Sequence, residues 1–157
     1  MRGQYLAENA HFVNILPPVD ITGGVLGDRF HLKKHQHATI VVQVGVSAAA
    51  WTKIILNACT AETSGTATAI AYRLYAEETA NGDTLGAKEA IAAAGRTPSA
   101  NNGIFYVIEI DASELPDGSP WLELSLTNGS NSVIASALAI LTGPRYAGAA
   151  DGMTAIA

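Results

Sequence analysis

The sequence has almost no cysteine, and this excludes two kinds of site. Cys59 is the only cysteine among the 157 residues. The chain can therefore form no internal disulfide and offers no cysteine-based zinc site. Because Cys59 ends the apolar run 54–59, we interpret it as a small buried hydrophobic residue, which is the usual place for a free cysteine.

Charge is also scarce. Charged residues make up 15% of the chain and the net charge is -5, whereas an average domain is about 25% charged. The negative balance argues against nucleic-acid binding, which requires a basic face to neutralise phosphates. A weakly charged surface rich in alanine, glycine, serine and threonine favours a protein that packs against neighbours.

Long apolar runs are missing. No run approaches the roughly 20 residues needed to cross a bilayer, so we predict no membrane partner. The start of the chain, 1–5, is followed by the polar Glu8 and Asn9 instead of an apolar segment, so we also predict no signal peptide. We expect a protein made inside a cell, which can still leave it by lysis or within a particle.

Apolar residues instead alternate with polar ones, the pattern of half-buried strands. With hydrophobic residues at 48%, the chain is predicted to form one domain with a real core. The fold class predicted is all-β, an antiparallel β-sandwich or jelly-roll-like single domain. The strands are expected near residues 38–46, 51–59, 67–77, 104–110, 122–126 and 133–141.

The clearest signal is the segment 103–141, which reads as a three-stranded β-meander joined by turns at Pro116-Asp117-Gly118 and Asn128-Gly129. Its predicted outer face is apolar as well, which indicates a sheet covered on both sides. The cover would be the remaining chain or a neighbouring subunit. The outer set predicted is Phe105, Val107, Trp121, Val133, Ala135, Ala137 and Ala139.

The two ends do not fit the strand pattern. Residues 1–27 contain Pro17 and Pro18 but also many apolar residues, and we predict an extended arm lying on its own surface or a neighbour's. Residues 28–146 form the predicted sandwich, and 147–157 a flexible tail. The segment 87–94 has helical composition in a β neighbourhood, so helix and strand both remain open.

No motif for catalysis, a cofactor or a metal stands out. His31, His35 and His37 are separated by Lys33 and Lys34, and these cations favour a solvated basic strand edge over a metal site. The acid pairs Glu77-Glu78 and Glu109 with Asp111 are interpreted as surface or turn residues. We therefore predict that the protein is not an enzyme.

Three segments carry a family resemblance: ATIVVQVGV at 38–46, NNGIFYVIEIDASEL at 102–115 and ASALAILTGPRY at 135–146. In order along the chain, they resemble the capsid-decorating (cement) proteins of tailed bacteriophages. The resemblance implies a virion structural protein on the capsid exterior that binds the phage major capsid protein, bridges its subunits and associates with itself as a dimer or trimer. Arg29 to His37 would then meet an acidic capsid face.

Aromatic residues are few, at 6%, and the two tryptophans leave an alternative open. Trp51 and Trp121 could form a platform for sugar rings, which predicts a head- or tail-associated module that binds host glycans. An outward tryptophan is also a common interface anchor. The interface residues predicted are Phe12, Ile15, Arg29, Lys33, Lys34, Trp121 and Tyr146.

Overall fold

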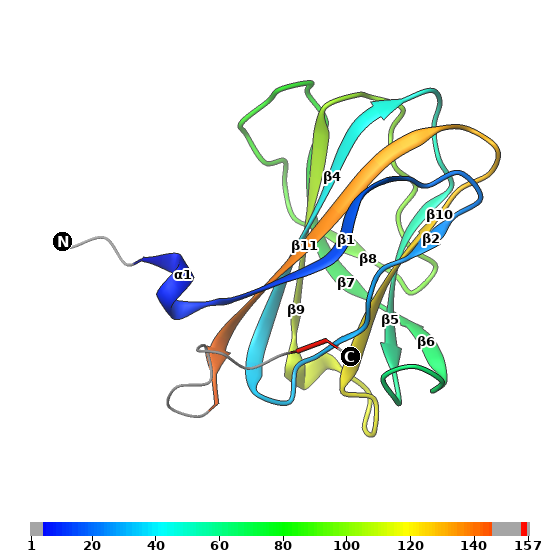
Figure 1. Cartoon of the computed structure of the whole chain (residues 1–157). Helices are drawn as coiled ribbons and strands as arrows, with labels where there is room; N and C mark the ends of the chain where they lie inside the picture. The colour runs from blue at the N-terminus through cyan, green and yellow to red at the C-terminus, as the bar shows by residue number, and fades with distance from the viewer. Residues whose placement is uncertain (1–4, 146–154, 157) are drawn as a thin grey trace.

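The computed structural model describes residues 5–145 and 155–156, and its regular structure is almost entirely β-strand (Figure 1). A six-stranded sheet has the order β1-β11-β4-β9-β7-β8, and a second sheet has the order β2-β10-β5-β6, with β3 also paired to β10. All these pairings are antiparallel. The all-β antiparallel sandwich is confirmed, and jelly-roll connectivity stays a prediction.

The elements have the following bounds. The six-stranded sheet contains β1 (His11–Asp20), β4 (His35–Ser47), β7 (Tyr72–Glu77), β8 (Glu89–Ile91), β9 (Ile104–Asp111) and β11 (Val133–Pro144). The second sheet contains β2 (Val25–Leu26), β3 (Phe30–His31), β5 (Lys53–Cys59), β6 (Ala67–Ile70) and β10 (Trp121–Thr127). The short helix α1 (Leu6–Asn9) precedes β1, and the 3-10 turn η1 (Ala112–Glu114) follows β9.

The core lies between the two sheets and follows the period of two predicted from the sequence. On β4 the inward residues Ile40, Val42 and Val44 are buried. The Tyr72 hydroxyl on β7 donates a hydrogen bond of 2.6 Å to the carbonyl of Ile54 on β5, which ties one sheet to the other. Burial of one large aliphatic side chain contributes roughly 1.5–3 kcal/mol, so these alternating rows are the main source of stability.

The predicted meander over 103–141 is wrong, although its strands exist. β9 and β11 belong to the six-stranded sheet and pair with β4, whereas β10 belongs to the other sheet and pairs with β5. The turns after β9 and β10 therefore carry the chain from one sheet to the other. Turn chemistry predicts a reversal of the chain, and it does not say which sheet receives the next strand.

The predicted outward face of β11 is also wrong. Val133, Ala135, Ala137 and Ala139 are buried in the core, and the alternating residues, such as Leu138, lie on the outer face. Both sets are almost wholly apolar, so periodicity alone could not choose between them. Phe105 and Val107 do lie on the outer face of β9 and are half-buried.

The predicted arm over 1–27 is part of the sandwich from residue 11 onward, which corrects the predicted boundary at 28. β1 pairs with β11 at the edge of the six-stranded sheet, and β2 pairs with β10. Pro17 and Pro18 lie where the register of β1 shifts between Leu16 and Val19. An edge strand with a bulge tolerates proline, because at these positions the N–H that proline lacks is not needed for a hydrogen bond to the partner strand.

Three other segments are now assigned. Within 87–94 the structure has a strand, β8, paired with β7. The single strand predicted at 67–77 is two strands in different sheets, β6 and β7. Of the predicted tail, the described residues are ordered against their own chain: His31 N–H donates to Ala155 O at 2.9 Å and Phe30 forms a bridge with Ile156.

Candidate interaction surface

The predicted interface residues do not gather in one place. Phe12 is 42% exposed on the outer face of β1, whereas Ile15, 1% exposed, is a core residue. The prediction for Ile15 is therefore wrong, because the arm that was expected to present it is a strand of the sandwich. Tyr146 lies outside the described residues.

Arg29 is engaged within its own chain. Its Nε donates to the Glu123 carboxylate at 2.7 Å, with side-chain exposures of 14% and 6%. Nη1 of the same guanidinium donates to the carbonyl of Ala61 at 2.8 Å. The hydrogen bond to Glu123 raises the pKa of Arg29. The prediction that Arg29 contacts a partner is therefore corrected. Arg29 forms a structural ion pair with Glu123 and offers little charge to a partner.

Lys33 and Lys34 do lie on a surface with free positive charge, together with Arg145, which the sequence did not predict. Lys33 and Lys34 occupy the turn between β3 and β4, and the backbone N–H of Arg145 donates to Lys34 O at 2.8 Å. Within the described ranges, none of the three forms an ion pair. We call Lys33, Lys34 and Arg145 the basic end.

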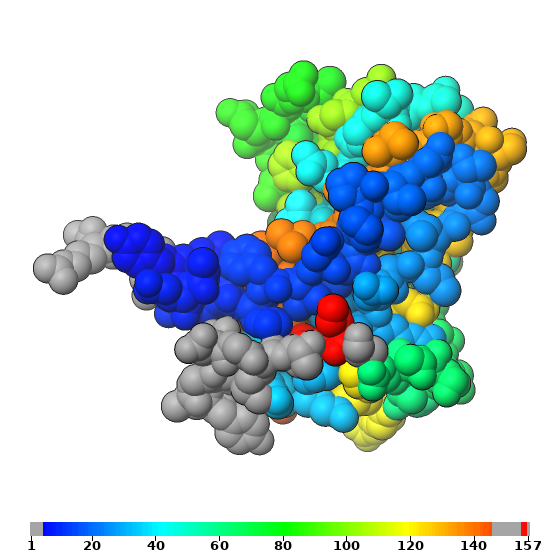
Figure 2. Space-filling view, viewed as in Figure 1, coloured from blue at the N-terminus to red at the C-terminus, as the bar shows by residue number. Residues whose placement is uncertain are grey.

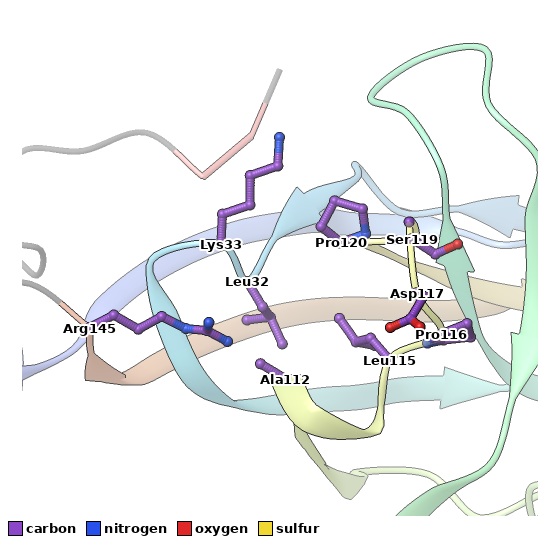
Figure 3. A pocket seen from close by; sticks show the side chains of 10 residues that line it. Leu32, Lys33, Ala112, Leu115, Pro116, Asp117, Ser119, Pro120 and Arg145 are labelled. Carbon is purple, nitrogen blue, oxygen red and sulfur yellow. The ribbon is translucent and has the colours of Figure 1, made fainter.

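The basic end borders a hollow of about 300 Å³. Figure 3 shows Arg145 extending toward Leu32 and Ala112, while Lys33 extends away from them. We call this the basic hollow; its lining includes Leu32, Lys33, Leu115, Asp117, Pro120 and Arg145. A second hollow, of about 470 Å³, also borders Arg145 and includes Gln36 and Asp111.

The tryptophans divide between core and surface. Trp51 is 2% exposed, so it cannot serve as a sugar platform. Trp121 is half-buried, with the His31 ring edge-on at 5.0 Å and Lys33 Nζ at 5.9 Å from its ring. The glycan hypothesis would thus depend on Trp121 alone, whose ring already has two partners.

The three histidines of the basic stretch have different surroundings. His35 is 2% exposed, its ring stacks on His11 at 5.9 Å, and neither ring nitrogen has a hydrogen-bond partner among the described residues. Burial lowers the pKa of His35, and His11, His31 and Lys34 lower it further. His31 likewise has a lowered pKa, first from burial and then from the neighbouring lysines.

His37 instead forms an ion cluster on the outer face. Its Nδ1 lies 2.7 Å from Asp111 Oδ1, and its Nε2 contacts the Glu109 carboxylate. Arg73 pairs with Asp111 at 3.0 Å and with Glu114. The hydrogen bond to His37 is the main cause of the lowered pKa of Asp111. Sequence reasoning placed both acids on one face but could not place His37 beside them, since this requires the register between β4 and β9.

Beside this cluster the outer face is apolar. Strand registers align Phe12 with Ile140, and Leu138 with Val41 and Val107. We use the name apolar outer face for the following set of residues: Phe12, Val41, Tyr75, Phe105, Val107, Leu138 and Ile140. A hollow of about 440 Å³ lies at its border with the ion cluster and includes Tyr75, Leu85 and Val107. In the described part of the chain no third layer covers this face.

The N-terminal segment adds further exposed apolar surface. α1 stands away from the sandwich at the left of the view (Figures 1 and 2), and Tyr5 and Leu6 are exposed. None of the four residues of α1 is buried. A helix of one turn is not stable in water on its own, so this segment is suited to a partner.

No protein-family model matches the sequence, and no curated protein is significantly similar to it. Among residues 5–145 and 155–156, no three His, Cys, Asp or Glu side chains are arranged to hold a metal ion. No helix within these same residues is long and apolar enough to cross a membrane.

Proposed function

We propose that this protein is a structural protein of a tailed-bacteriophage particle, which binds the outer surface of the head and stabilises its lattice by bridging major capsid subunits. The observation that carries the proposal is the apolar outer face, a sheet surface over which residues 5–145 and 155–156 place no third layer. Phe12 is exposed and the other six residues of this face are half-buried, and a contiguous apolar patch of this kind marks protein contacts. The three sequence segments that resemble capsid-decorating proteins support the same function, and the proposal includes no catalytic role.

Bridging requires contact with more than one neighbour, and the chain offers two chemically distinct surfaces. The apolar outer face suits a desolvated contact, whereas the basic end suits an acidic surface. Single contacts of this size are weak, but repetition over a lattice raises the total affinity by avidity. Positive charge at one end would mainly orient the protein as it docks.

Self-association is part of the proposal, and the apolar outer face is the surface that we assign to it. The exposed Tyr5 and Leu6 next to β1 supply additional area. Phe12→Asp combined with Ile140→Asp is expected to convert the oligomer to a monomer in analytical ultracentrifugation. Val46→Asp, at an exposed position on β4 outside this face, should leave the mass unchanged.

The decisive experiment for the function is a reconstruction of the particle. We expect this chain on the head exterior in many symmetric copies, and purified heads that lack it should take it up to a fixed stoichiometry. Absence of the chain from purified virions would remove the proposal. If glycan arrays instead detect sugar binding that Trp121→Ala abolishes, the protein is a host-recognition module.

A further inference from the structure

We propose that the basic end binds an acidic peptide segment of a partner protein and that one apolar side chain of this segment fills the basic hollow. Lys33, Lys34 and Arg145 have no carboxylate within ion-pair distance in the described ranges, although the chain carries a net charge of -5. The other arginines of these ranges all have carboxylate partners: Arg29, Arg73 and Arg96.

The walls of the basic hollow are held in place by backbone hydrogen bonds. His35 N–H donates to Leu32 O at 3.3 Å in the lysine turn, and Ser119 N–H donates to Pro116 O at 3.0 Å in the facing loop. Leu32 N–H donates to Pro120 O at 3.1 Å and joins the two walls. A preformed site of this kind avoids much of the ordering cost of binding.

The size and lining favour a side chain over a larger ligand. The volume of about 300 Å³ is at the lower end of the roughly 300–1,000 Å³ typical of small-molecule sites. Leu32, Leu115 and Pro120 provide apolar contacts for an aliphatic group. A bare phosphate would leave this apolar lining unfilled, so the chemistry favours a peptide with both carboxylates and an apolar residue.

The cations lie on both sides of Leu32. Arg145 reaches over the hollow, while Lys33 extends the other way (Figure 3). Arg145 Nε donates to His35 O at 3.3 Å, and Lys33 Nζ lies 5.9 Å from the centre of the Trp121 ring. Arg145 can therefore bind one carboxylate through its planar fork, and Lys33 a second one further along the peptide. Asp117, on the loop wall, repels carboxylates and so directs them toward the two cations.

This inference deepens the proposed function by naming a partner chemistry, but it does not require the partner to be a capsid subunit. A failure of peptide binding would leave self-association through the apolar outer face and the presence of the protein on virions intact. Absence of the protein from virions would leave peptide binding at the basic end intact. The two proposals can therefore fail separately.

The test uses the full chain and a fluorescein-labelled peptide, Asp-Glu-Leu-Glu-Asp, with Asn-Gln-Leu-Gln-Asn as the neutral control. Fluorescence polarisation at about 50 mM salt should show saturable binding of the acidic peptide alone, weaker at about 300 mM. Lys33→Glu with Arg145→Glu should weaken binding by about tenfold or more. Lys53→Glu with Lys88→Glu makes the same charge change elsewhere and should alter it less than about twofold.

Shift mapping on the wild-type protein keeps the proposal testable even if the double variant does not fold. Peptide-induced amide shifts in a two-dimensional NMR spectrum should centre on Lys33, Leu115 and Arg145. The proposal is overturned if these shifts centre elsewhere, or if the neutral peptide binds equally well. It is also overturned if a thymidine oligonucleotide binds this site more tightly than the acidic peptide, since the site would then recognise phosphate.

Discussion

Nδ1 of His37 lies 2.7 Å from Oδ1 of Asp111, and this contact joins β4 to β9 across the outer face of the sheet. The other ring nitrogen contacts the Glu109 carboxylate. A neutral imidazole has one N–H donor, so both contacts are hydrogen bonds only when the ring carries two protons. Burial opposes the charged ring, but the hydrogen bonds to Asp111 and Glu109 outweigh it and raise the pKa of His37.

His37→Gln should remove a stabilising contribution that depends on pH. A folded-state pKa above the ordinary 6.5 means that the contribution is complete below pH 6.5 and is lost as pH rises through the folded-state value. The variant should therefore be less stable than wild type by about 1 kcal/mol at about pH 6, and the difference should shrink in alkali. Urea unfolding at a series of pH values measures it. Lys88→Gln, with no ion pair in the described ranges, should show a difference independent of pH.

His35 should give the opposite pH dependence. Burial, followed by the charges of neighbouring histidines and Lys34, lowers its pKa below 6.5. The unfolded chain therefore takes up a proton more readily than the folded one, and stability is complete above pH 6.5 and falls as the pH drops. His35→Leu should reduce this fall of the unfolding free energy at acid pH. If the unfolding free energy of the variant falls as steeply at acid pH as that of wild type, another group causes the fall.

Substitution of only one residue of the Arg29–Glu123 pair should lower the free energy of unfolding strongly. With side-chain exposures of 14% and 6%, removal of either partner leaves a charge that is poorly hydrated. Glu123→Gln is expected to cost about 3 kcal/mol, whereas Arg29→Met with Glu123→Leu should recover most of this loss. Denaturant unfolding of Glu123→Gln measures the loss, and unfolding of Arg29→Met, Glu123→Leu and the double variant measures the coupling.

A surface pair supplies the control for that cycle. Arg73 and Glu114 have side-chain exposures of 33% and 40%, so solvent screens their attraction. Glu114→Gln should cost less than about 1 kcal/mol. Equal losses at Glu114 and Glu123 would contradict the assignment of Arg29 to a structural role and would return it to the predicted interface.

The sequence predicted the strands and turns, which depend on local pattern. It did not predict contacts that depend on pairing between strands far apart in the chain. Alternation identified the inward faces of β4, β9 and β10 because each opposite face carries at least one polar residue, such as Gln43, Glu109 and Glu123. It could not orient β11, whose two faces are both apolar. His37 and Asp111 are 74 residues apart, and their contact follows from strand register, which no local pattern encodes. Arg145 was missed for the same reason, since it reaches the lysine turn only through the pairing of β11 with β4.

Gly95 should tolerate no side chain. Its φ of +79° is a left-handed conformation, and an added Cβ would lie 2.5 Å from Ile54 O. Gly95→Ala must therefore both strain the backbone and displace β5, so we expect a loss of about 2–3 kcal/mol in the unfolding free energy. Gly118 has a similar φ of +78° with open space around it. Gly118→Ala should lose only the conformational part, about 1 kcal/mol, and an equal loss at both positions would show that the contact with Ile54 can relax.

Two truncations should separate the projecting segment from the edge strand. Removal of residues 1–9 takes away α1, none of whose residues is buried, and keeps the buried Ala10, so the unfolding transition measured by circular dichroism should keep its midpoint. Removal of residues 1–20 also takes away β1, with the buried Val13, Ile15 and Leu16. At roughly 1.5–3 kcal/mol for each large side chain, the loss approaches the whole stability of a typical domain, about 5–15 kcal/mol. The longer truncation should therefore abolish cooperative unfolding.

The pair of truncations also tests the interaction proposals, because the shorter one leaves the fold intact. Loss of self-association after removal of residues 1–9, with an unchanged transition, would assign Tyr5 and Leu6 to the contact between copies. If the longer truncation unfolds at the wild-type midpoint, β1 adds nothing to the core and behaves as the arm predicted from the sequence. In that case the edge of the sheet would be β11, and its newly open backbone would be the surface to examine for partner binding.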